Sequence, residues 1–207
     1  MRHGKGCTQA LKEWTRKSRA TITYDGDVDE FIGKGLFDKV KGKENIAVVG
    51  FTTRGDIFGV FFSVAVTEQG LVEDPTIFVF SFESHGRCET PQMFKMKDEW
   101  RYEAYLLFGK NKADACVLFC VPTIGYFNFG DEKFDSSCSF LGYLFEGLDD
   151  TTLTGKTNHL AFDNREYRHT ARLIAVQLSY MSLFQKRRFL CGMKKGDRFR
   201  ETRPDMR

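Results

Sequence analysis

Side chains capable of nucleophilic chemistry are crowded into one short polar segment, Glu83-Ser-His-Gly-Arg-Cys-Glu89. Cys88 is a candidate nucleophile, His85 a candidate base, and Arg87 a cation that would favour the thiolate form of its neighbour. A thiol with a lowered pKa would react with peroxide. The sequence also allows a solvated loop between two strands with an incidental cysteine, because closeness in sequence does not fix geometry.

Two short motifs match known patterns only by letter. Gly155-Lys-Thr157 resembles the end of a phosphate-binding loop, but the full pattern needs a glycine where Asp150 stands, and an acid there would repel phosphate. Arg54-Gly-Asp56 matches a cell-adhesion tripeptide, but Gly55 and Asp56 suit a tight hairpin turn equally well. Neither motif therefore predicts a ligand.

The cysteines do not predict a metal site. Cys116 and Cys120 are four residues apart, which on a straight strand separates them by about 13 Å. No second Cys or His pair stands at ligand spacing, so we expect neither a metal nor a cofactor. The six cysteines are scattered, and without a secretory route we expect them to be reduced thiols.

The elements that must position the 83–91 loop begin with a strong hairpin. Residues 45–53 and 57–66 are rich in β-branched and aromatic side chains, and the turn at residues 54–56 separates them. Both segments are apolar at nearly every position, so we expect them to be covered on both faces. A further strand over residues 76–82 leads into the loop.

Other elements follow from shorter patterns. Residues 8–19 predict an amphipathic helix with Leu11 and Trp14 on one face, and Asp27 with Glu30 at capping-box spacing predicts a second helix over residues 28–41. The remaining strands are expected at residues 20–24, 92–96, 103–108, 115–121, 126–129 and 172–179. Eight to ten strands with two or three helices predict a mainly β (α+β) fold, an antiparallel two-sheet β-sandwich with flanking short helices.

Charge divides the 207 residues into three parts. Residues 1–19 hold six Lys or Arg against one acid, and residues 182–207 hold nine against three, which leaves sixteen bases and twenty-four acids between them. We therefore expect a basic N-terminal segment with a short helix (1–20), a domain (21–181) and a basic C-terminal tail (182–207). The basic ends are either solvated tails or a surface for nucleic acid or anionic lipid. Aromatic residues are sparse in both ends, so we expect no specific nucleic-acid partner.

The sequence shows no targeting or membrane signal. No stretch approaches the roughly 18 apolar residues of a membrane helix, and the basic start lacks the apolar run of a secretory signal. We expect a cytoplasmic protein with no transmembrane segment.

Three sequence features, in the same order along the chain, resemble the TLDc domain of the oxidation-resistance proteins over about residues 24–178. They are the hairpin strand Ile57-Phe-Gly-Val-Phe-Phe-Ser63 with the following Phe78-Val-Phe80, the segment Gly125-Tyr-Phe-Asn-Phe-Gly130, and Ser137-Cys-Ser-Phe140 before a closing apolar strand. The chain departs from the family pattern in its reduced central glycines and in Ala175-Val-Gln177.

This resemblance implies an antiparallel β-sandwich flanked by helices and no established catalytic residues. It implies a protein-interaction module linked to oxidative-stress protection or to regulation of the vacuolar proton-pumping ATPase, whose subunits would be the partners. The alternative, from the residues themselves, is a thiol-based antioxidant enzyme that uses Cys88 with His85 and Arg87.

Overall fold

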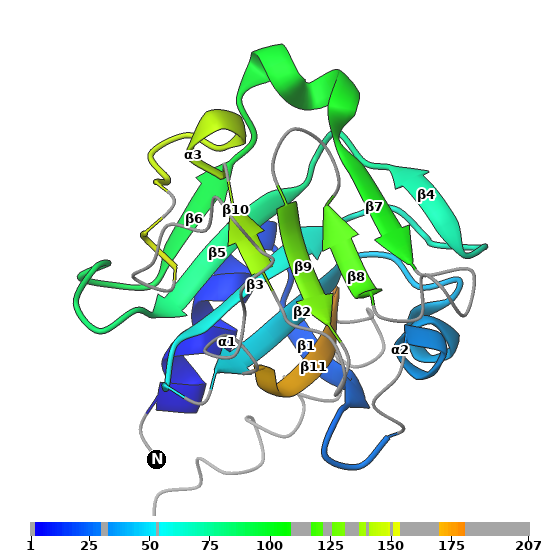
Figure 1. Ribbon diagram of the computed structural model, residues 1–207. Coiled ribbons are helices and arrows are strands. Elements are labelled where there is room, and N and C mark those ends of the chain that lie inside the picture. The colour runs from blue at the N-terminus through cyan, green and yellow to red at the C-terminus, as the bar shows by residue number, and fades with distance from the viewer. Residues whose placement is uncertain are drawn as a thin grey trace, which may run out of the picture.

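The fold is known from a computed structural model, which describes residues 3–29, 33–52, 54–108, 117–121, 126–130, 137–139, 141–149, 151–153 and 170–180. The chain is mainly β, with short helices (Figure 1). The helices are α1 (His3–Thr15), α2 (Gly33–Val40), the 3-10 helix η1 (Asp98–Glu103) and α3 (Leu141–Leu144).

The described strands form two antiparallel sheets. The six-stranded sheet has the order β1 (Arg19–Asp25), β11 (Thr170–Ser179), β2 (Ile46–Thr52), β3 (Ile57–Phe62), β5 (Phe78–Glu83) and β6 (Gln92–Lys95). The five-stranded sheet has the order β10 (Ser137–Ser139), β9 (Tyr126–Gly130), β8 (Val117–Val121), β7 (Tyr105–Phe108) and β4 (Gly70–Glu73).

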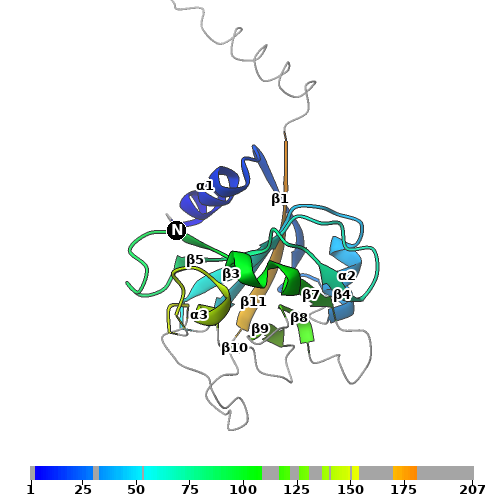
Figure 2. The same cartoon turned by 90° about the horizontal axis from the view of Figure 1, so that it is seen from above.

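Strands β2 and β3 of the six-stranded sheet are buried on both faces, as the continuous apolar runs predicted. Alternate residues of β2 enter two separate core clusters: Ile46 and Val48 belong to one, and Ala47 and Val49 to the other. In Figure 2, α1 lies on one side of this sheet, and α3, β8 and β9 lie on the other.

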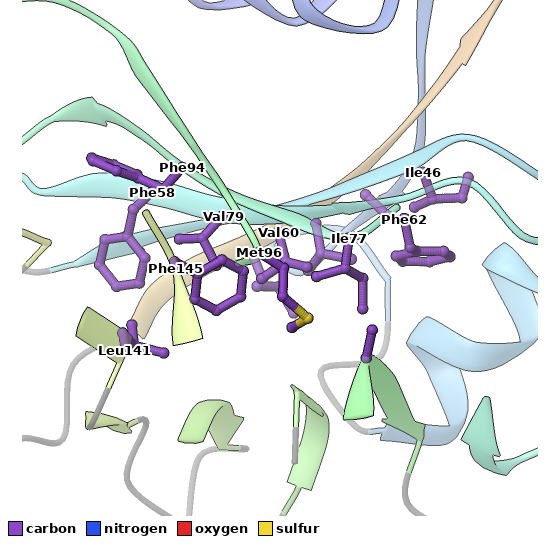
Figure 3. Packing of buried hydrophobic residues seen from close by; sticks show 14 of the residues in the cluster. Ile46, Phe58, Val60, Phe62, Ile77, Val79, Phe94, Met96, Leu141 and Phe145 are labelled. Atoms are coloured by element: carbon purple, nitrogen blue, oxygen red, sulfur yellow. The ribbon is translucent and has the colours of Figure 1, made fainter. Parts of the chain in front are cut away.

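The larger cluster fills the side of the sheet opposite α1. Phe58, Val60 and Val79 point from β3 and β5 toward Leu141 and Phe145 (Figure 3). Leu36, Phe37 and Val40 from α2 join the same cluster. Burial of these side chains is the main stabilising contribution that holds the sheet to its surroundings.

Helix α1 covers the other face. Leu11 is 3% exposed, and Trp14 stacks on Phe82 with ring centroids 5.8 Å apart and also contacts Phe78 and Phe80. The three phenylalanines alternate along β5 and therefore share one face. The predicted pairing of Leu11 and Trp14 on one helix face is confirmed, although the helix runs from residue 3 to 15 rather than from 8 to 19. Strand β1 begins at Arg19 and so spans the predicted boundary at residue 20.

The helix predicted over residues 28–41 is wrong at its start, because residues 28 and 29 lie in a turn and α2 begins at Gly33. Glu30 lies outside the described residues. The carboxylate of Asp25 accepts a hydrogen bond from the Asp27 amide at 3.1 Å, and Arg172 of β11 binds Asp25 and Asp27. The contacts with Arg172 of β11 thus stabilise a turn where the sequence predicted a helix cap.

A buried carboxylate organises the connection from β3 to β5. Asp74, fully buried, accepts hydrogen bonds from the amides of Ser63 at 2.5 Å and Thr76 at 2.9 Å, and from the Thr76 hydroxyl at 2.6 Å. These donors satisfy a charge that would otherwise be costly to bury.

Candidate functional site

The 83–91 loop lies against the turn of the β2–β3 hairpin. Strands β3 and β5 are antiparallel neighbours, and Ile57 stands opposite Glu83. The turn that precedes β3 and the loop that follows β5 therefore meet at the same end of the sheet. This pairing of the two segments brings the 83–91 loop against the hairpin turn.

The hairpin turn presents one buried acid to the loop. Gly55 has φ of 92°, a conformation that favours glycine. The Asp56 amide donates to the Thr52 hydroxyl oxygen at 3.0 Å, and Asp56 is 2% exposed. A buried carboxylate needs a cationic or hydrogen-bonding partner.

Arg87 supplies that partner. Its Nη2 lies 2.5 Å from Oδ1 of Asp56. The same nitrogen donates to the carbonyl of Leu153 at 2.9 Å, and Nε donates to the carbonyl of Thr152 at 3.1 Å. One guanidinium thus joins the hairpin turn, the 83–91 loop and the segment at residues 152–153, using the fork of donors that arginine offers.

His85 forms a second contact between the 83–91 loop and the hairpin turn. It has φ of 52° and is followed by Gly86 with φ of 82°, so the chain reverses sharply here. The ring Nε2 lies 2.7 Å from the Arg54 carbonyl oxygen and 3.7 Å from Oδ1 of Asp56. At 2.7 Å from a carbonyl oxygen, this nitrogen carries the proton and acts as a donor.

The base of the loop is held by its own side chains. The buried Ser84 hydroxyl accepts a hydrogen bond from the Cys88 amide at 2.7 Å, and Glu83 accepts from the amides of Ser84 at 3.1 Å and His85 at 2.9 Å. Cys88 is partly buried and packs against the larger core cluster. The loop conformation is therefore defined by internal contacts as well as by the hairpin.

A cavity of about 560 Å³ lies between this loop and the start of α1. Cys7 and Cys88 both line it, together with Phe82, Glu83 and Glu89. Burial raises the pKa of the Cys7 thiol, a backbone hydrogen bond opposes part of this effect, and the nearby Glu83 carboxylate adds a smaller upward shift. A raised pKa disfavours the thiolate, which is the nucleophilic form of a cysteine side chain.

The candidate residues are gathered at one end of the sheet, but their contacts differ from a catalytic arrangement. The described contacts of Arg87 and His85 are with Asp56 and with backbone carbonyls, and none is with the Cys88 thiol. Opposite charge on Asp56 offsets the cation of Arg87. Catalysis by Cys88 therefore stays a prediction.

Two residues of the site were not predicted from sequence. Asp56 was interpreted only as turn chemistry, and Cys7 was placed in the basic N-terminal segment. The signal for Asp56 is the strand order: once the hairpin and residues 76–82 are paired antiparallel, the turn before β3 must meet the loop after β5. Cys7 carries no comparable signal, since its place depends on how α1 crosses the sheet.

Several sequence predictions fall outside the described residues, namely the Gly155–Thr157 motif, Cys116 and the tail 182–207. Within the described residues, no three His, Cys, Asp or Glu side chains are grouped as metal ligands. None of the described helices is both long and apolar enough to cross a membrane.

The sequence matches no family model, and no curated protein matches it significantly.

Proposed function

We propose that this protein is a non-enzymatic protein-interaction module of the TLDc type, acting in the cytoplasm in oxidative-stress protection or in regulation of the vacuolar proton-pumping ATPase. Its partner would be a protein, with subunits of that pump as the first candidates. The sequence features that resemble the TLDc domain support this assignment, and the proposed fold is the two-sheet sandwich that the resemblance implies.

The observation that carries the proposal is that charged side chains of the loop are engaged in structural contacts, above all the Asp56–Arg87 ion pair. His85 and Arg87, the groups that would activate a thiol, instead fix the loop to the hairpin turn and to residues 152–153. Loops held on a rigid sheet are common binding surfaces, and a fixed conformation lowers the entropy cost of association. The exposed side chains of Arg54 and Glu89 border this surface.

The test is direct binding to vacuolar membranes that carry the assembled pump, with purified pump as the confirming partner. We expect saturable binding that falls at least tenfold in the charge-exchanged variant Arg54→Glu/Glu89→Lys. The matched control Lys41→Glu/Glu68→Lys exchanges two exposed charges elsewhere and should bind within twofold of the parent. Equal binding by both variants, or none by the parent, would overturn the proposed partner.

The second candidate is the thiol-based antioxidant enzyme, which the cavity beside Cys88 favours, since peroxide could reach a thiol there. In this reaction the Cys88 thiolate attacks hydrogen peroxide, the O–O bond breaks, and sulfenic acid and hydroxide form; an added dithiol would then reduce the sulfenic acid and release water. Peroxide consumption with dithiothreitol should be at background for the parent and for Cys88→Ser if the first proposal holds. Consumption by the parent that is lost in Cys88→Ser would favour the enzyme instead.

A further inference from the structure

A second hollow lies at the opposite end of α1 from the two cysteines. This groove has a volume of about 660 Å³ and is bordered by the last turn of α1 and by residues of β3, β5 and β6. We call it the α1 groove. It shares no lining residue with the cavity beside Cys88.

The floor of the α1 groove is apolar and aromatic. Phe61 and Phe78 are stacked with ring centroids 4.7 Å apart, and Trp14 meets Phe78 edge-on at 6.3 Å. Met93 of β6 also lines the groove, beside the polar side chains of Asn45, Ser63 and Thr76. Aromatic rings beside a flexible thioether form a surface that suits an alkyl chain.

The rim is basic. Arg16, Lys17, Lys95 and Arg101 line the groove against one acid, Glu13. Two of the four cations are engaged, because Lys17 lies over the Tyr180 ring at 4.1 Å and Arg101 pairs with Asp98 at 2.8 Å.

The other two cations are available. Arg16 and Lys95 are exposed and form no ion pair within the described part of the chain. The end of a helix carries a negative charge of roughly half an elementary charge, which these two unpaired cations outweigh.

The size of the groove favours a small ligand over a protein. Sites for small molecules typically have volumes of about 300–1,000 Å³ and combine apolar walls with a few polar groups that fix orientation. A stable protein interface needs roughly 800 Å² on each partner, much of it relatively flat. The volume and the combination of aromatic and cationic side chains therefore match one small amphiphilic anion.

We propose that the α1 groove binds a free, single-chain carboxylate amphiphile, an anion of the fatty-acid type. Its alkyl chain lies on Trp14, Phe61, Phe78 and Met93, and its carboxylate pairs with Arg16 and Lys95. This proposal does not depend on the proposed function, because it uses neither the 83–91 loop nor a protein partner.

Titration calorimetry of the full chain with dodecanoate, kept below its micelle concentration, tests the proposal. We expect saturable binding of one dodecanoate per chain. Dodecyltrimethylammonium should bind at least tenfold more weakly because its head carries the wrong charge. Butyrate should also bind at least tenfold more weakly because it buries less apolar surface. These comparisons use the unaltered protein, so they do not depend on whether a variant folds.

A pair of variants then locates the site. Arg16→Glu/Lys95→Glu should weaken dodecanoate binding at least tenfold. Lys41→Glu/Arg54→Glu changes the net charge equally with residues that do not line the groove, and it should bind within twofold of the parent. Circular dichroism checks that both variants are folded.

Four results would overturn the proposal. They are the absence of dodecanoate binding, equal binding of the cationic amphiphile, equal loss in both variants, and binding only to phosphatidylserine vesicles. Binding of a Glu-rich aromatic peptide that is lost in Arg16→Glu/Lys95→Glu, without dodecanoate binding, would instead assign the groove to an acidic peptide.

Discussion

Arg87 and Asp56 form an ion pair with Nη2 and Oδ1 2.5 Å apart, and this contact joins two segments that are 31 residues apart in the sequence. Asp56 is almost fully buried, whereas the Arg87 side chain is 26% exposed. Asp56 therefore depends on the ion pair more than Arg87 does, because the guanidinium retains some access to water.

Replacement of Asp56 by asparagine should destabilise the protein. The change keeps the side-chain shape but leaves the Arg87 guanidinium without its counter-charge in a partly buried place. We expect a loss of about 1–3 kcal/mol in the free energy of unfolding, measured by urea denaturation. Asp98→Asn removes an exposed pair with Arg101 and should cost less than about 0.5 kcal/mol. Equal losses would show that the Asp56 contact contributes little.

Gly59 should tolerate no side chain. A Cβ at this position would lie 2.2 Å from the Val48 carbonyl oxygen and 2.5 Å from the Phe80 ring, so strands β2 and β5 would have to move. Gly59→Ala should lower the free energy of unfolding by about 3 kcal/mol. The control Gly6→Ala meets no atom within 4 Å in α1 and should stabilise by about 0.5–1 kcal/mol. A mild effect at Gly59 would contradict the close packing of these strands.

Helix α1 should contribute to global stability. Leu11 is buried in the cluster that α1 shares with the six-stranded sheet. Truncation to alanine should cost about 2–4 kcal/mol in urea denaturation. Gln9→Ala, on the exposed side of the same helix, should stay within about 0.5 kcal/mol of the parent. A neutral Leu11→Ala would mean that α1 is a detachable segment.

Stability should fall in acid through the turn at residues 25–29. The Arg172 hydrogen bond holds the pKa of the Asp25 carboxyl below its ordinary value of 3.8. A group with a depressed folded-state pKa stabilises the protein above its unfolded-state pKa, and this contribution is lost as pH falls through the folded-state value. The urea midpoint should therefore drop below about pH 4, and Arg172→Met should reduce the size of that drop. Lys34→Met, which breaks the exposed pair with Asp38, should leave the drop unchanged.

The hairpin of β2 and β3 could be predicted because its signal is local. Apolar residues at successive positions and a Gly-Asp turn define both strands, and burial on two faces follows from that pattern. The short strand β4 was not predicted, since Gly70–Glu73 has no strong pattern and depends on pairing with β7. The start of α2 was wrong because Arg172, distant in sequence, organises the preceding turn.

The candidate site was predictable only in part for the same reason. The polar composition of the 83–91 loop was visible in the sequence, and the structure shows that its side chains converge on one end of the sheet. Their partners were not visible, because Asp56 and the carbonyls at residues 152 and 153 are brought in by tertiary packing.

Strand β11 lies between β1 and β2 in the six-stranded sheet, so the two early strands are never direct neighbours. During synthesis on the ribosome, β1 and one edge of β2 have no strand partner until residues 170–179 have emerged. Strand pairing over such a sequence separation is slow, and unpaired edges promote aggregation. The nascent chain should therefore depend on chaperones until this late strand inserts, and a chain stopped before it should expose the apolar edge of β2.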